Sequence, residues 1–181
     1  MSIRSASQWA AAFALLAVAL VANPARADRE FVAFDKAYPK GAIVIVNKER
    51  RLYYVLGQGR ALRYPIAIGR PDEMWTGRQV VMSKKENPTW TDPEDSENVE
   101  EPGPNNPLGV RALYLGWSLW RIHGTPKDWS IGRNVSNGCI RMHNRDVVDL
   151  FDRVHVGAPV FVVNALSDPM PSHWGKKVAE Q

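Results

Sequence analysis

The sequence predicts a mainly β protein, a sandwich or barrel with one principal α-helix. Segments rich in β-branched and aromatic residues recur at intervals of about 8–12 residues, with turn-forming residues between them. One segment, which begins at Asn144, instead places its apolar residues at helical spacing. The chain has 181 residues, 45% of them hydrophobic and 23% charged, which suits a single domain with a substantial core.

The first 27 residues are typical of a signal peptide and are left out of the fold. Arg4 supplies a positive start, residues 9–22 are mostly apolar, and Ala25 and Ala27 are small residues at the spacing that a signal peptidase reads. This apolar run is shorter than the roughly 20 residues of a spanning helix, so a retained anchor is the weaker alternative. We therefore expect export to the periplasm, with a mature chain that begins at Asp28 and keeps no stable membrane anchor.

The rest of the chain divides into a short N-terminal extension (28–40), one folded domain (41–165) and a polar, frayed C-terminal tail (166–181). Loss of Arg4 and Arg26 lowers the count of Lys and Arg from 23 to 21, against 19 Asp and Glu, which leaves a net charge of +2. Such a balance gives no reason to expect nucleic-acid binding.

The domain is expected to open with a hairpin whose turn lies at 47–50, followed by a second turn at 57–59. The predicted strands cover 42–46, 51–56, 62–68, 79–82, 110–115, 118–123 and 159–163. Between 86 and 108, closely spaced prolines and acidic residues predict a long loop without regular structure. Trp90 is a candidate wall of a substrate groove there, although a plain surface loop is the alternative.

The predicted helix starts with Asn144 as its cap and has Asp146 in its first turn. Its apolar stripe, which we expect to pack on the sheet, consists of Val147, Leu150, Phe151 and Val154.

The only cysteine, Cys139, lies between Gly138 and Ile140 in the stretch Val135-Ser136-Asn137-Gly138-Cys139-Ile140-Arg141-Met142. A single cysteine cannot form a disulfide within the chain, so it is either a buried structural thiol or a reactive one. A reactive thiol needs a nearby imidazole or positive potential, because few thiols are ionised at neutral pH.

Four histidines are candidates for the base. His123 is preferred, because it ends a predicted apolar strand and precedes Gly124, where the backbone can turn. His143 lies at the start of the helix, His155 at its end and His173 in the tail. A zinc site is the competing use of Cys and His, but the chain has none of the paired ligand spacings that such sites use, so we predict no metal.

These motifs resemble the L,D-transpeptidase catalytic domain of the YkuD type. The resemblance rests on His123-Gly124-Thr125, Ile131-Gly132 and Ser136-Asn137-Gly138-Cys139-Ile140-Arg141. It extends to Pro88-Thr89-Trp90, to 103–109 and to the segment 144–147, and it covers 42–164. It implies that 41–165 is such a catalytic domain, which needs no cofactor.

The resemblance also implies roles for individual residues. Cys139 is the nucleophile and His123 the general base, whose ring is oriented by the Gly124 carbonyl. Backbone N–H groups around Gly138 and Cys139 are the expected oxyanion donors. Arg141 either pairs with a donor carboxylate or braces the loop. The residues expected to line the site are Gly124, Ser136, Asn137, Gly138 and Arg141.

One position departs from the family pattern, because Asn137 stands where a second histidine is usual. An amide cannot exchange a proton near neutral pH, so this change bears on the pH profile and on substrate binding. The base assigned to His123 is untouched.

The implied function is that of an exported L,D-transpeptidase of peptidoglycan biosynthesis, which acts in cell wall organisation and cell shape and is a carbapenem target. Its partners are peptidoglycan stem peptides, with an amine of another stem, or of an exported protein, as acyl acceptor. The alternatives are an L,D-carboxypeptidase, a hydrolase that releases wall proteins, a sortase-like transpeptidase and a non-catalytic wall-binding domain.

Overall fold

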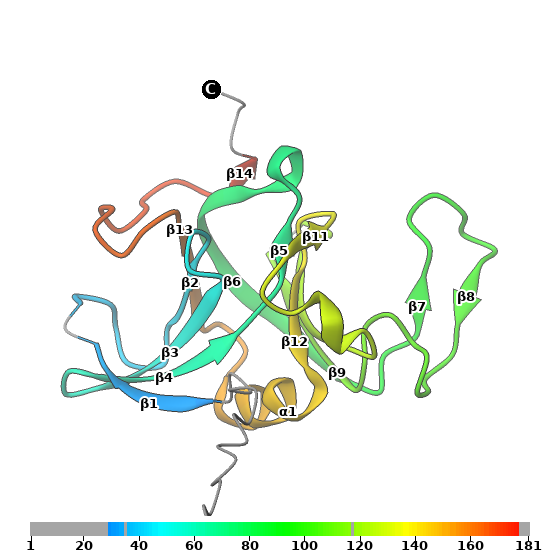
Figure 1. Ribbon diagram of the computed structural model, residues 1–181, viewed down its shortest axis with the longest axis horizontal. Coiled ribbons are helices and arrows are strands. Elements are labelled where there is room, and N and C mark those ends of the chain that lie inside the picture. The colour runs from blue at the N-terminus through cyan, green and yellow to red at the C-terminus, as the bar shows by residue number, and fades with distance from the viewer. Residues whose placement is uncertain (1–28, 35, 117, 178–181) are drawn as a thin grey trace, which may run out of the picture.

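The computed structural model describes residues 29–34, 36–116 and 118–177, which form a mainly β structure with one α-helix (Figure 1). The predicted fold class is therefore confirmed. The predicted signal peptide lies outside the described residues, and no helix within those ranges is long and apolar enough to cross a membrane. The strands are β1 (Glu30–Ala33), β2 (Ile43–Val46), β3 (Arg51–Gly57), β4 (Arg60–Pro65), β5 (Ile68–Gly69), β6 (Trp75–Glu86), β7 (Trp90–Thr91), β8 (Val99–Glu100), β9 (Arg111–Leu115), β10 (Arg121–Thr125), β11 (Asn134–Ser136), β12 (Ile140–His143), β13 (Pro159–Val163) and β14 (Lys176–Lys177).

One long strand, β6, joins the two halves of the main sheet, whose order is β1-β4-β3-β2-β13-β6-β9-β10-β12. Its first half pairs with β13 and its second half with β9. A shift in register between Val81 and Ser83 marks the point where β6 passes from one half to the other. The sheet also curls on itself, because Ala67, just after β4, exchanges two backbone hydrogen bonds of 2.9 Å with Arg141 of β12.

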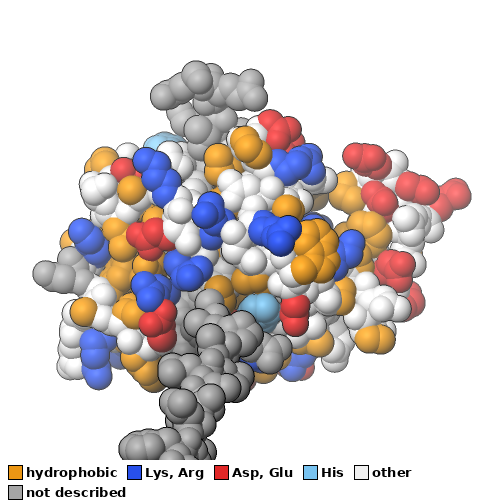
Figure 2. Space-filling view, in the orientation of Figure 1, with side chains coloured by type: hydrophobic (Ala, Val, Ile, Leu, Met, Phe, Trp, Pro, Cys, Tyr) orange, Lys and Arg blue, Asp and Glu red, His pale blue; other side chains and the backbone are white. Residues whose placement is uncertain are grey.

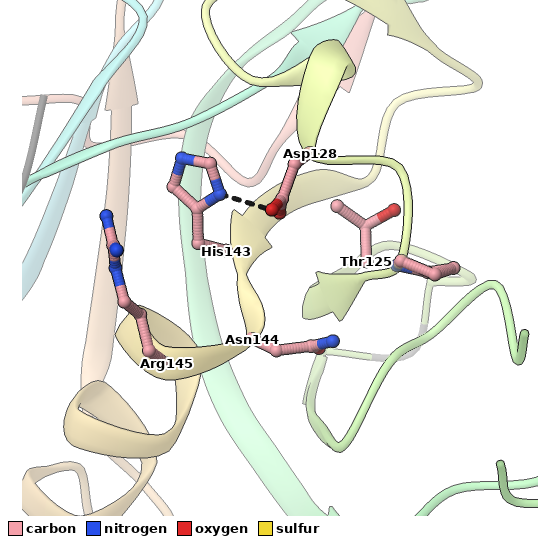
Figure 3. Close-up of a pocket in the computed structure, with 6 residues that line it drawn as sticks. Thr125, Asp128, His143, Asn144 and Arg145 are labelled. Carbon is pink, nitrogen blue, oxygen red and sulfur yellow. Dashed lines mark hydrogen bonds and ion pairs between the residues drawn. The ribbon is translucent and has the colours of Figure 1, made fainter. Parts of the chain in front are cut away.

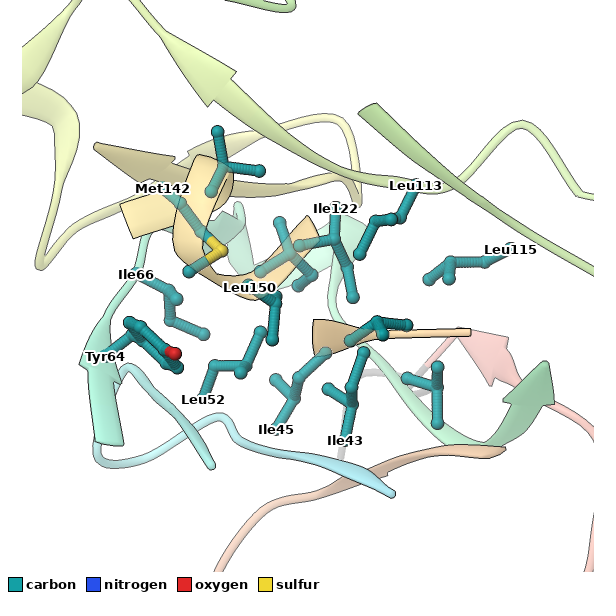
Figure 4. Close-up of a cluster of buried hydrophobic side chains, with 14 of the residues drawn as sticks. Ile43, Ile45, Leu52, Tyr64, Ile66, Leu113, Leu115, Ile122, Met142 and Leu150 are labelled. Carbon is teal, nitrogen blue, oxygen red and sulfur yellow. The ribbon is translucent and has the colours of Figure 1, made fainter. Parts of the chain in front are cut away.

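Two hydrophobic clusters pack against opposite faces of β2, which explains why every residue of this strand is buried. Ile43 and Ile45 point into the larger cluster (Figure 4), whereas Val44 and Val46 point into the smaller one. Burial of each such side chain stabilises the fold by about 1.5–3 kcal/mol. The alternation is the ordinary consequence of a strand with a period of two between two apolar layers.

The helix α1 (Asn144–Arg153) covers the larger cluster with Val147, Leu150 and Phe151. Asn144 does not cap it, contrary to the prediction, since His143 occupies the cap position without a side-chain bond. The Asn144 Oδ1 instead accepts a hydrogen bond of 3.2 Å from the Val110 N–H. Glycine is needed at two neighbouring positions, because a Cβ at Gly109 or Gly124 would lie 2.2 Å from this oxygen.

Three predicted strands differ from the structure by more than one residue at an end. The strand expected over 62–68 stops at Pro65, because Ala67 turns to pair with Arg141. The one expected over 79–82 is part of the 12-residue β6. The one expected over 118–123 begins at Arg121 and continues to Thr125, so His123 lies in the middle of β10 and not at its end.

The loop over 86–108 was predicted to lack regular structure, but β7 and β8 pair within it. The Asn106 side chain closes this loop by donating to the Pro88 and Glu100 carbonyls at 2.9 Å each. The hairpin projects from the body in Figure 1, and Figure 2 shows acidic side chains gathered on it. Trp90 is half-buried at the start of β7, and its role as a groove wall stays a prediction.

The C-terminal segment is less frayed than predicted, because its described part joins the sheet. The Arg78 N–H donates to the His173 carbonyl at 2.8 Å, and the Arg78 carbonyl accepts from the Gly175 N–H at 3.0 Å. The short strand β14 then pairs with the start of β6. These bonds explain why a polar sequence is ordered here: its backbone groups find partners along an edge that β6 leaves open.

Candidate active site

Two parallel neighbours, β10 and β12, bring the predicted nucleophile and base together. Ile122 pairs with Ile140, and His123 pairs with Arg141. Both isoleucines lie in the core, so the alternating side chains of His123 and Arg141 share the opposite face. Extension of this register by one residue brings Cys139 opposite Arg121. Cys139 and His123 are then diagonal neighbours, with Cα atoms about 8 Å apart.

The loop that carries Cys139 is pinned by Ser136. The Ser136 hydroxyl donates to the Cys139 carbonyl at 2.5 Å and accepts from the Gly138 N–H at 3.2 Å. The buried Ser136 therefore acts through the backbone of the loop, not as a group exposed to a ligand.

Gly138 adopts a backbone that other residues rarely adopt, with φ at +98°. Its carbonyl accepts a hydrogen bond of 2.8 Å from the Trp75 indole. Trp75 in turn stacks on Trp120 with ring centres 4.2 Å apart. A Cβ at position 138 would lie 2.6 Å from the Trp120 Nε1, so the tryptophan pair leaves room only for glycine.

The thiol of Cys139 is partly exposed and is aimed at a neighbouring loop. Its sulfur lies 3.7 Å from the Leu119 carbonyl oxygen, to which the S–H donates. The same oxygen accepts a hydrogen bond of 2.9 Å from the Arg121 guanidinium. Arg121 therefore lies beside the thiol, as the strand register indicates.

His123 is buried, with 4% of its surface exposed, and its tautomer follows from one contact. Its Nδ1 lies 2.6 Å from the Gly124 carbonyl oxygen, which can only accept, so Nδ1 carries the proton and Nε2 a lone pair. The pKa of His123 is lowered to about 3, chiefly by burial and also by the charges of Arg141 and Arg121, which together outweigh the opposite effect of the Gly124 carbonyl. The ring is therefore neutral at pH 7 and able to accept a proton.

Arg141 and Asn137 have different surroundings. Burial lowers the pKa of Arg141, an effect that the nearby Cys139 opposes. The exposed Asn137 accepts a hydrogen bond of 2.5 Å from Arg70. Asn137 occupies the position where the family pattern usually has a histidine, and its amide joins the loop to Arg70, the residue after β5.

The other histidines lie apart from the thiol. The His143 Nδ1 lies 2.8 Å from a carboxylate oxygen of Asp128, in a separate hollow of about 240 Å³ that Thr125 and Asn144 also line (Figure 3). His155 and His173 are exposed. The structure therefore brings together all the predicted site residues except Asn137, which turns to Arg70.

The sequence reasoning missed Arg121, Leu119 and the tryptophan pair. The sequence could have indicated Arg121, because it lies two residues before His123 and therefore on the same face of the strand. The contacts of Leu119 and of the tryptophans depend on loops distant in sequence, so no local pattern indicated them.

Comparison with known proteins identifies the family of the chain. Residues 41–162 match the YkuD family, the L,D-transpeptidase catalytic domain. The "Probable L,D-transpeptidase YbiS" of Escherichia coli K12 is 39% identical over 153 residues, or 73% of this chain and 49% of that protein. The "Probable L,D-transpeptidase ErfK/SrfK" of the same strain is 34% identical over 152 residues, or 75% and 49%. The chain thus spans about half the length of these relatives.

A solved structure shares the fold. The catalytic domain of the E. faecium L,D-transpeptidase, acylated by ertapenem, superposes with a TM-score of 0.55 at 23% identity, over 71% of this chain and all of that domain (100%). Because the family match extends over more than half of the sequence, the chain belongs to the YkuD family of L,D-transpeptidase catalytic domains.

Proposed function

We propose that this protein is a periplasmic L,D-transpeptidase that acts on peptidoglycan stem peptides, with Cys139 as nucleophile and His123 as general base. The observation that carries the proposal is the diagonal placement of these two residues on β10 and β12, with the lone pair of His123 set on Nε2 by the Gly124 carbonyl. The predicted signal peptide accounts for delivery to the periplasm.

The first step forms a thioester. The Cys139 S–H turns from the Leu119 carbonyl to the His123 Nε2, which takes the proton as the sulfur attacks the carbonyl of the third stem residue. The C–N bond to the terminal D-amino acid then breaks, and Nε2 returns the proton to the leaving amine. Because burial keeps the His123 ring neutral, Nε2 can take the proton as the sulfur attacks.

The second step repeats this proton transfer with an amine of a neighbouring stem. His123 takes a proton from the attacking amine, an amide bond forms and the sulfur leaves with the proton. In both steps the negative oxygen of the intermediate needs donors. The Cys139 N–H makes no backbone hydrogen bond to the described residues, so it is the first donor, and the Gly138 N–H, 3.2 Å from the Ser136 hydroxyl, is a weaker second one.

The test uses purified tetrapeptide-bearing muropeptides and mass spectrometry. We expect a cross-linked dimer that has lost one terminal D-amino acid, and Cys139→Ala abolishes it. A tripeptide without dimer would show that water is the acceptor and would overturn transfer to an amine. Ertapenem should add its mass at Cys139, and dimer formation by Cys139→Ala would refute the nucleophile.

A further inference from the structure

Two arginines occupy the other diagonal of the site face. Arg121 lies beside Cys139, and Arg141 pairs with His123 across the two strands. Among the described residues neither guanidinium forms an ion pair with a carboxylate, although both are partly buried. Partly buried positive charges without a counter-ion are costly, so this face is built to receive an anion.

The guanidinium of Arg121 is held in place before any ligand arrives. It lies over the Tyr114 ring, 5.3 Å from the ring centre, and donates to the Leu119 carbonyl at 2.9 Å. Its Nε is buried and has no hydrogen-bond partner in the described structure. Because the buried Nε is out of reach of a ligand, the donors offered to a carboxylate are those of the two Nη atoms, and Leu119 takes only one of their hydrogens.

The sheet register adds a third positive charge and no negative one. Lys85 of β6, Ala112 of β9, His123 and Arg141 follow one another across the sheet. Ser83, Tyr114 and Arg121 form the adjacent row. Neither row contains Asp or Glu, so the charges that face His123 from these strands are all basic.

The ligand is identified by its position relative to the bond that is cut, and this step rests on the proposed function. In the donor stem the terminal carboxylate follows the scissile carbonyl by three bonds, so the two carbon atoms are less than about 4 Å apart. A carbonyl in contact with the sulfur must therefore place the carboxylate beside Cys139, where both guanidinium groups lie. We propose that Arg121 and Arg141 bind the terminal carboxylate of the donor stem and so select stems that end one residue after the scissile bond.

The electrostatics of His123 agree with this assignment. The charges of Arg121 and Arg141 lower the pKa of His123, and a bound carboxylate offsets them. The donor thus makes the base more basic while its carboxylate is present. Nε2 returns its proton to the leaving amine, and departure of the D-amino acid then removes the carboxylate, so the pKa of His123 falls again before the second step.

The first test needs no peptidoglycan. Iodoacetate and iodoacetamide alkylate a thiol in the same way, each with loss of iodide, and differ in one carboxylate. The ratio of their rates at Cys139, followed by intact mass, should fall about tenfold in Arg121→Gln and in Arg141→Gln. The control Arg133→Gln, which removes an arginine that contacts the exposed Trp129, should keep the ratio of the unmodified protein.

The iodoacetamide rate reports whether each variant keeps its folded site, because this reagent is neutral. Arg121→Lys provides a second variant, which retains the charge without the fork and should recover part of the ratio. Equal ratios in the unmodified protein and in both glutamine variants would refute the carboxylate site.

The second test compares a tetrapeptide stem with the same stem whose C-terminus is an amide. We expect the amide to react at least about tenfold more slowly, and Arg121→Gln to reduce this difference. Equal rates for acid and amide would refute the inference and leave the proposed function standing. Absence of reaction with either stem would refute the proposed function, and the alkylation ratio would still decide the carboxylate site.

Discussion

The buried neutral His123 makes the stability of the fold depend on pH in a calculable way. Its pKa is about 3 in the folded protein and about 6.5 in the unfolded chain. Between these values the unfolded chain binds more protons, so the contribution of His123 is present above pH 6.5 and is lost as pH falls. From pH 7 to pH 5 the linkage relation gives a loss of about 2 kcal/mol. This figure changes little if the folded pKa is as high as 4, because at pH 5 the folded ring remains neutral.

The perturbation that isolates this effect is His123→Gln, measured by urea denaturation at pH 7 and pH 5. The free energy of unfolding of the unmodified protein should fall about 2 kcal/mol further than that of the variant, since all other groups cancel in the difference. His155→Gln is the matched control, because His155 is exposed and should show the pH dependence of the unmodified protein. An equal fall in the His123 variant and the unmodified protein would refute a buried neutral imidazole.

Three further substitutions test the loop that carries the thiol. Gly138→Ala should cost about 2–4 kcal/mol in thermal denaturation, because φ is +98° and the new Cβ meets Trp120; a cost below about 1 kcal/mol would contradict this geometry. Ser136→Ala removes both hydrogen bonds to the loop and should cost about 1–3 kcal/mol and slow alkylation of Cys139; an unchanged rate would show that the hydroxyl does not position the thiol. Asn137→Ala breaks an exposed contact with Arg70 and should change the free energy of unfolding by less than about 0.5 kcal/mol, so a loss above about 1 kcal/mol would assign the pair a structural role.

Local patterns were sufficient where burial is decided by neighbours in the sequence. The continuous apolar run of β2 and the helical spacing of Val147, Leu150 and Phe151 in α1 correspond to observed elements. The predicted strand over 159–163 matches β13 residue for residue. Such segments bury enough apolar surface that no distant contact overrides their local preference.

The predicted ends of elements were wrong where a segment distant in sequence supplies the hydrogen-bond partner. Pro65 ends β4 because Ala67 bonds to Arg141, and β14 forms because β6 offers a free edge. Asn144 was expected to cap α1 but meets the Val110 N–H instead. In each case two choices of hydrogen-bond partner are locally acceptable, and only the packed chain selects between them.

The sequence by itself determined the mainly β class, the position of the helix and the pairing of Cys139 with His123 as candidates, because these follow from composition, periodicity and motif. Only the tertiary structure decided that His123 lies in the middle of a strand, that its ring is buried and that Arg121 joins Arg141 on the same face. The physical reason is that proton positions and charge pairs depend on which strands become neighbours, and parallel pairing between separate segments is a property of the whole fold.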